Sequence, residues 1–279
     1  MKAITGLSEI ADRFDLFLVD QYGVLHDGIA AYPGAIEGLA ELASRGRKVV
    51  VLTNSGKGAA ANRARLARLG FAASLYDEVV SSGEVALQRV KAGVFGQGLA
   101  TGSDVCVIGR TGDTYAFSSD DFTLVPRPED AAHLIFAGSD APRTSLVAYR
   151  SVLAGAAQAG VPAICVNPDI TMIRDGALIP APGAIAGIYE SLGGRVDYVG
   201  KPYPAIFQSA HALFDAVPAN RVVMIGDSPE HDVAGARPMG FATLLVRTGI
   251  HRDLSEQELM RVCASHGGAP DFLSASLEW

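Results

Sequence analysis

Polar side chains follow four β-rich runs, at the points where we expect each strand to end. Asp20 follows the run Phe-Leu-Val, and Thr53 follows Val-Val-Val-Leu. Lys201 follows a third run, and Asp227 follows Val-Val-Met-Ile, with Asp232 five residues further on. A carboxylate at the end of a buried strand is costly unless a metal or hydrogen bonds satisfy it. One such residue is commonplace, but three aspartates, a threonine and a lysine at four strand ends form a candidate site.

These residue types suit phosphoryl transfer. Asp20 can act as a nucleophile and form an aspartyl-phosphate. Mg²⁺ prefers oxygen ligands, usually one or two carboxylates with waters and substrate phosphate, and Asp20 and Asp227 could supply the carboxylates. Asp232 could be a further ligand or hold a metal-bound water. The Thr53 hydroxyl and the Lys201 ammonium would hold the transferring phosphoryl oxygens and offset their charge.

The elements that must position these residues alternate between strand and helix patterns. This alternation predicts an α/β protein with parallel sheets, right-handed connections and ligands at the carboxyl ends of the strands. Ser255 with Glu258 three residues later predicts the capped start of a late helix. The predicted strands include 17–20, 49–52, 105–108, 134–136, 163–166, 222–225 and 242–246, and the predicted helices include 33–46, 62–69, 81–91, 145–157, 232–236 and one that begins near Pro182.

Composition limits the classes of function. The 279 residues are 49% hydrophobic and 19% charged, which excludes intrinsic disorder. A net charge of −7 argues against a nucleic-acid or anionic-membrane surface. The three scattered cysteines fit a reducing compartment, and neither a membrane span nor a signal-peptide core is visible, so we predict a cytoplasmic protein. The segment 96–98 is not a dinucleotide fingerprint, because it lacks the preceding strand and the later acidic partner.

Six motifs, in this order, resemble those of the haloacid dehalogenase (HAD) superfamily, in the NagD-like subfamily with a type-IIA cap. The resemblance covers nearly the whole chain, and the motifs are specific jointly rather than singly. They are Asp20…Gly23-Val24-Leu25…Gly28, Leu52-Thr53-Asn54, Asn167-Pro168-Asp169, Pro182-Gly183-Ala184, Gly200-Lys201-Pro202 and Gly226-Asp227…Asp232.

The resemblance implies a Rossmann-like parallel-sheet core, 1–82 plus 196–279, and an inserted α/β cap, 83–195, that selects the substrate. It implies a Mg²⁺-dependent phosphatase for a small phosphorylated metabolite, with a possible homodimer through the cap. Asp20 would be the nucleophile, and Thr53, Asn54 and Lys201 would position the phosphoryl group. The metal ligands would be the carboxylates of Asp20 and Asp227 and the carbonyl of Tyr22, with Asp232 supporting the site.

One position departs from the family pattern. Phosphatases of this superfamily usually carry a second aspartate two residues after the nucleophile, as general acid and base, where this chain has Tyr22. Such catalysis contributes roughly 10²–10⁴-fold, and a phenol is a poor base near neutral pH. The protein could be a slow or specialised phosphatase, with His26 or Asp27 as a substitute. It could instead be a metal-independent 2-haloacid dehalogenase, or a binding or regulatory protein on a weakened scaffold.

Four residues are candidate contacts to the substrate, one in the predicted core and three in the predicted cap. By the resemblance, Asn54, Asn167, Asp169 and Gly183 contribute to substrate binding. An Asx-turn before a hairpin explains Asn167 and Asp169 equally well, and close packing explains Gly183. Arg174 could clamp a second anionic group of the substrate or be solvated, and for Lys57 both anion steering and simple exposure stay open. Asn54 could instead form an Asx-turn. Asp140 could face the active-site cleft or be a turn residue at a strand end, and Arg143, like Arg174, could clamp an anionic group or be solvated.

Overall fold

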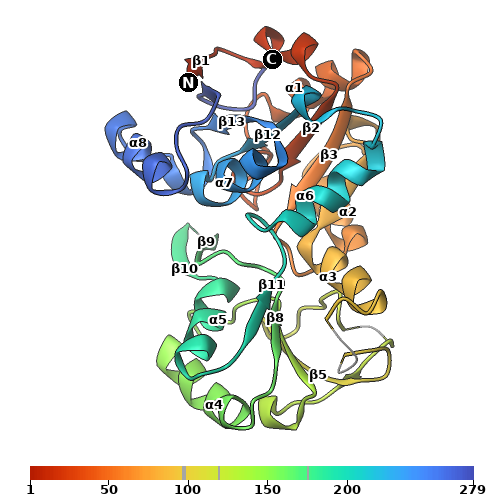
Figure 1. The fold of residues 1–279 in the computed structure, drawn as a ribbon. Helices are drawn as coiled ribbons and strands as arrows, with labels where there is room; N and C mark the ends of the chain where they lie inside the picture. The colour runs from red at the N-terminus through yellow and green to blue at the C-terminus, as the bar shows by residue number, and fades with distance from the viewer. Residues whose placement is uncertain (96–98, 119, 175) are drawn as a thin grey trace. The chain divides into compact units, whose positions relative to one another are not determined.

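The structure is a computed structural model (Figure 1). It describes residues 1–95, 99–118, 120–174 and 176–279. The segment 96–98, considered above as a dinucleotide motif, lies outside the described residues. Contacts divide the chain into two compact units, the first comprising 1–53, 59–80 and 201–279 and the second 54–58 and 81–200. Among the described helices, none is long and apolar enough to cross a membrane.

The first unit contains a seven-stranded sheet in the order β1-β14-β13-β12-β2-β3-β4. The strand pairs from β1 to β3 run parallel, which confirms the predicted α/β class. All residues of β2 and β12 are buried, as expected for apolar runs covered on both faces. The strands are β1 Lys2–Ala3, β2 Leu16–Asp20, β3 Lys48–Thr53, β4 Glu78–Ser81, β12 Val222–Gly226, β13 Ala242–Val246 and β14 Phe272–Ser274.

Helices connect these strands, and their ends follow local sequence signals. Ser255 and Glu258 form the predicted capping box at the start of the late helix. The predicted helix 232–236 is wrong in its first part, because Asp232 lies within a π-helical turn, Pro229–Val233, that precedes the short helix. The helices of the first unit are α1 Ala35–Ser44, α2 Ala59–Arg68, α6 Pro204–His211, α7 Ala234–Ala236 and α8 Glu256–Ser265.

The second unit is also α/β, with a five-stranded parallel sheet in the order β11-β8-β7-β5-β6. An antiparallel hairpin of β9 and β10 accompanies it. Its strands are β5 Asp104–Ile108, β6 Thr123–Leu124, β7 His133–Phe136, β8 Ala163–Cys165, β9 Thr171–Arg174, β10 Ala177–Pro180 and β11 Val196–Tyr198. Its helices are α3 Ser82–Lys91, α4 Leu146–Gln158 and α5 Pro182–Ser191.

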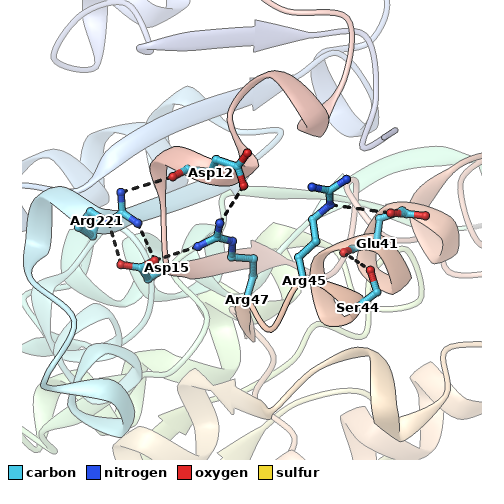
Figure 2. Close-up of polar contacts among 7 residues, drawn as sticks. All are labelled: Asp12, Asp15, Glu41, Ser44, Arg45, Arg47 and Arg221. Carbon is cyan, nitrogen blue, oxygen red and sulfur yellow. Dashed lines mark hydrogen bonds and ion pairs between the residues drawn. The ribbon is translucent and has the colours of Figure 1, made fainter.

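An ion-pair network ties together the amino ends of three strands of the first sheet (Figure 2). Asp15, just before β2, accepts two hydrogen bonds from Arg221, at 2.6 and 2.7 Å, one to each carboxylate oxygen. Arg47, just before β3, donates to Asp15 at 3.0 Å and to Asp12 at 2.9 Å. The bond from Arg221 lowers the pKa of Asp15 below its ordinary value, although partial burial opposes this. This edge of the sheet therefore holds acidic groups with matched cations.

Candidate active site

Three aspartates meet at the opposite, carboxyl edge of the first sheet. Asp20 is the last residue of β2, and Asp227 and Asp232 follow β12, which is paired with β2. Each offers a carboxylate oxygen within 4.8 Å of those of the other two, and all three side chains are buried. Parallel strand ends meet at one edge of a sheet, so the chain brings these residues together from segments about 200 positions apart.

Lys201 lies between two of these carboxylates. Its Nζ is 2.7 Å from Oδ1 of Asp20 and 2.7 Å from Oδ1 of Asp232, and its side chain is 3% exposed. Oδ1 of Asp20 also accepts a hydrogen bond of 2.7 Å from the backbone N–H of Gln21. In the described part of the chain, Oδ2 of Asp20 has no hydrogen-bond partner. The nucleophile candidate is thus oriented through one oxygen while the other stays available.

The electrostatics of the site are unbalanced. Burial raises the pKa of Asp20 to about 7, although the Lys201 charge opposes the rise. Burial and the charges of Asp20 and Asp232 raise the pKa of Asp227 well above its ordinary value. Burial disfavours the Lys201 cation, but the adjacent carboxylates outweigh burial, so the pKa of Lys201 is raised. One ammonium faces three carboxylates, so a further cation would relieve the remaining repulsion.

The loop after β13 holds Asp227, and sequence reasoning missed it. The backbone N–H of Ile250 donates to Oδ2 of Asp227 at 3.0 Å, and the Thr248 hydroxyl donates to the carbonyl of Gly23. Gly23 and Gly249 both have positive φ, and a Cβ on either would clash with the Asp227 carboxylate. Among the described residues, Oδ1 of Asp227 has no partner. The one available signal is Thr-Gly one residue beyond the end of another parallel strand, which could have placed this loop at the same edge.

Asp232 has both carboxylate oxygens engaged. Oδ1 faces Lys201, and Oδ2 accepts a hydrogen bond of 3.1 Å from the backbone N–H of Ser228. The π-helical turn that contains Asp232 returns this side chain to the end of β12, where a Cβ on Gly226 would lie 2.0 Å from the Asp232 carboxylate. Asp232 therefore orients Lys201 and the turn, while its carboxylate also lies in the cluster with Asp20 and Asp227.

Tyr22 packs against the loop that follows it. Its ring meets that of His26 edge-on, with ring centroids 5.5 Å apart. A Cβ at Gly28, whose φ is +97°, would lie 2.8 Å from Cε2 of Tyr22 and 3.1 Å from its hydroxyl oxygen. Glycine at position 28 thus provides the space that the phenol occupies.

His26 is fully buried and held at both ring nitrogens. Nδ1 accepts a hydrogen bond of 2.9 Å from the N–H of Gly28, and Nε2 lies 3.1 Å from the Gln21 side-chain amide. Burial, with a smaller contribution from the charge of Arg65, lowers the pKa of His26 to about 4. The atom of Gln21 that faces Nε2 is the amide nitrogen, whereas its buried Oε1 has no hydrogen-bond partner among the described residues. The His26 ring therefore stabilises this loop. A general acid would instead need a ring nitrogen that can exchange a proton with the substrate.

Thr53 and the predicted substrate contacts fall in different units. Thr53 ends β3 beside Asp20 and is buried. The other four predicted residues gather within the second unit. Asn54 donates to Asp169 at 2.8 Å, Asp169 donates its N–H to the Asn167 side chain at 3.0 Å, and its carbonyl accepts from the N–H of Gly183 at 2.9 Å. The Asx-turn at Asn167 and the close packing of Gly183 on Pro168 are thus both present.

Two cations considered as anion binders have internal partners instead. Arg174 donates to the backbone carbonyls of Ser139, at 3.1 Å, and Ala141, at 2.7 Å. Lys57 pairs with Asp113 at 3.0 Å. Asp140, a candidate cleft residue, accepts a hydrogen bond of 3.1 Å from the Thr111 hydroxyl. These side chains therefore fix loops of the second unit, and Arg174 is half-buried rather than fully solvated.

Comparison with known proteins identifies the class. Residues 17–123 match the family model of haloacid dehalogenase-like hydrolases, and residues 198–277 match that of HAD-hydrolase-like domains. Glycerol-3-phosphate phosphatase from Gallus gallus is 30% identical to this chain over 94% of the chain and 89% of the relative. The chain therefore belongs to the haloacid dehalogenase-like hydrolases, as the motifs predicted.

Similar solved structures indicate the subfamily of the chain. A haloacid dehalogenase-like hydrolase from Brucella suis has 28% identity and a TM-score of 0.84, covering 98% of this chain and 99% of that one. A glycerol phosphate phosphatase from Mycobacterium tuberculosis, solved in complex with magnesium, has 26% identity and a TM-score of 0.72, covering 96% of this chain and 76% of that one. Within its family, the chain is of the NagD-like, class IIA type, whose members are phosphatases.

Proposed function

We propose that this protein is a Mg²⁺-dependent phosphatase that hydrolyses a small phosphate monoester through an aspartyl-phosphate on Asp20. The observation that carries the proposal is the buried cluster of Asp20, Asp227 and Asp232 around a single bridging ammonium, that of Lys201. A catalytically inert scaffold has no use for three buried carboxylates with one cation between them, because each charge removed from water is costly.

The donor set fits a hard divalent cation. Oxygen ligands at a strand edge, of which Oδ2 of Asp20 and Oδ1 of Asp227 are uncommitted in the described part of the chain, suit Mg²⁺. The resemblance adds the backbone carbonyl of Tyr22. Asp232 supports the site through Lys201 or a metal-bound water, since both of its oxygens have other partners. When bound, Mg²⁺ supplies charge stabilisation for the phosphoryl oxygens.

The residues of the chain divide the chemistry among them. Asp20 attacks phosphorus in line with the leaving oxygen, while Lys201 and the Thr53 hydroxyl hold the phosphoryl oxygens. The N–H of Gln21 and the Lys201 ammonium orient the Asp20 carboxylate before attack. No second carboxylate stands two residues after Asp20, so protonation of the leaving oxygen falls to the Tyr22 phenol or to water. Leaving groups that depart as stable anions should therefore react fastest.

The substrate class follows from these features and from the relatives. The glycerol-3-phosphate and glycerol phosphate phosphatases named above make a phosphorylated glycerol a candidate substrate. We propose that the second unit acts as the cap that selects the substrate and that Asn54, Asn167, Asp169 and Gly183 contribute to its binding. Alanine at Asn54 should then raise KM more than it lowers kcat.

Phosphate release tests the proposal. We would measure inorganic phosphate from glycerol 3-phosphate, acetyl phosphate and 4-nitrophenyl phosphate, with Mg²⁺ and with EDTA. We expect release that EDTA abolishes and that restored Mg²⁺ recovers, with the aryl and acyl phosphates fastest. Halide release from a 2-haloacid without metal would instead establish a dehalogenase, which Tyr22 alone favours. Binding of these phosphates without any release would establish a regulatory role.

A further inference from the structure

The surroundings of Asp20 support the two halves of the reaction unequally; this inference rests on the proposed function. In the first half, an oxygen of Asp20 bonds to phosphorus while the bond from phosphorus to the leaving oxygen breaks. In the second half, a water oxygen bonds to phosphorus, the bond to Asp20 breaks with its electron pair returning to the carboxylate, and the water loses a proton. An aryl leaving group departs as an anion and needs no acid, but attacking water gains roughly 10²–10⁴-fold from a base.

Tyr22 is a phenol where the reaction uses a carboxylate. The phenol presents an O–H group that can donate, whereas an ionised carboxylate presents only acceptor oxygens. The ring is held against His26 and the space left by Gly28, so it stays beside its own loop. Tyr22 can therefore donate a hydrogen bond or a proton but offers no base for the attacking water.

The two neighbouring residues cannot substitute for the missing base. His26 is buried with 0% exposure, and both ring nitrogens face partners within the loop, Gly28 and the Gln21 amide. Asp27 is directed into its own turn, where Oδ1 accepts hydrogen bonds of 2.8 Å from the backbone N–H groups of both Ile29 and Ala30. Each group stabilises the loop 26–30 and is held away from exchange with a substrate water.

The nearby carboxylates after β12 are also committed. Glu230 faces the His251 ring, with 3.1 Å from Nε2 to each of its oxygens. Asp232 faces Lys201 and Ser228, and Asp227 belongs to the metal cluster. The structure describes every residue of the first unit. Each of the three carboxylates named here either has a hydrogen-bond or ion-pair partner or belongs to the cluster with Asp20.

We propose that, for aryl and acyl phosphates, whose leaving groups depart without an acid, the second half-reaction limits turnover, so that Asp20 carries the phosphoryl group for most of each catalytic cycle. The phosphorylated protein, rather than the free enzyme, is then the main species whenever substrate is saturating. In an enzyme with a carboxylate at position 22, by contrast, that carboxylate acts as the base that activates the attacking water.

Rapid mixing of the full chain with Mg²⁺ and saturating 4-nitrophenyl phosphate tests this. We expect a burst of nitrophenolate close to one equivalent per protein, with no matching burst of inorganic phosphate. Acid quenching during the steady state should give a protein heavier by one phosphoryl group, and peptide mass spectrometry should place that group on Asp20. In Tyr22→Asp, the adduct should fall to a small fraction and the steady rate should rise roughly 10²-fold.

A matched control addresses the remaining carboxylate. Asp27→Asn keeps the Oδ1 acceptor of the turn but removes the charge, so we expect an unchanged burst and a steady rate within about twofold of the wild type. A fall of roughly 10²-fold would identify Asp27 as the base and overturn the proposal. Equal rates of nitrophenolate and phosphate release from the first turnover, with no adduct, would overturn it while leaving the phosphatase function intact. If the wild type released neither product, the proposed function itself would fail.

Discussion

The two edges of the first sheet treat the same kind of residue in opposite ways. At the amino edge, Asp15 before β2 has arginine partners from the starts of β3 and β12, and its pKa is lowered (Figure 2). At the carboxyl edge, Asp20 at the end of the same strand shares one lysine with two other aspartates, and burial raises its pKa to about 7. An acidic residue that pairs with arginines stabilises the fold. A cluster of three aspartates with only one lysine has excess negative charge, which a bound metal cation would neutralise.

The largest effect that we expect at the carboxyl edge concerns Asp227. Asp227→Asn should lower kcat by roughly 10³-fold, because the site loses a carboxylate that holds the cation. In EDTA the same variant should melt at a higher temperature than the wild type, because it loses a buried carboxylate repelled by Asp20 and Asp232. Mg²⁺ should raise the melting temperature of the wild type but not of the variant. A variant that kept full activity would contradict the metal assignment.

Tyr22→Asp should have the next largest effect. It places a carboxylate at the position of the missing acid and base, so activity on alkyl phosphates should rise roughly 10²-fold. Steady-state rates on glycerol 3-phosphate measure this, with 4-nitrophenyl phosphate as the comparison. An unchanged or lower rate on alkyl phosphates would indicate that another group supplies the acid or that the aspartate distorts the loop.

His26 predicts a pH dependence of stability. In the folded protein its pKa is about 4, against 6.5 in the unfolded chain, so the unfolded state takes up a proton first as the pH falls. His26 should therefore cost about 3 kcal/mol of unfolding free energy between pH 7 and pH 4, relative to a non-titrating residue. Urea unfolding of the wild type and of His26→Gln, compared at each pH, isolates this contribution. A difference that stays constant over this pH range would show that folding leaves the pKa of His26 unshifted.

Asp15→Asn is the matched control at the amino edge and has the smallest effect. It should lower the free energy of unfolding by about 1 kcal/mol, since these ion pairs are partly exposed. The lowered pKa of Asp15 means that this stabilisation exists above the unfolded-state pKa and is lost as the pH falls below it. The variant should retain wild-type kcat, and Mg²⁺ should still raise its melting temperature. A large loss of activity would show that the two edges are coupled.

Much of this fold could be predicted because continuous apolar runs define buried parallel strands. The runs that became β2 and β12 place Asp20 and Asp227 at one edge, and parallel topology requires that edge to be shared. Side-chain type alone then pointed to the cluster. The predicted helix at 232–236 was wrong at its start because a π-helical turn has no periodicity that distinguishes it from an α-helix over five residues.

Other parts of the site could not be predicted, because they depend on backbone groups or on tertiary packing. The hydrogen bond from Ile250 to Asp227 uses a backbone N–H, which no side-chain pattern reports. The burial of His26 depends on the path of its loop. From the sequence, a histidine near the nucleophile could therefore be interpreted either as an acid or as a structural residue. Arg174 likewise proved to support two backbone carbonyls, a role with no sequence signature.

Asp20 is the proposed nucleophile, and substitution of this one residue tests that role. Phosphate release from 4-nitrophenyl phosphate with Mg²⁺ should be measured for the wild type and for Asp20→Asn, which keeps the shape of the side chain. We expect release by the wild type that EDTA abolishes, and at least about 10⁴-fold less release by the variant. Release by Asp20→Asn at the wild-type rate would show that the attacking oxygen lies on another residue.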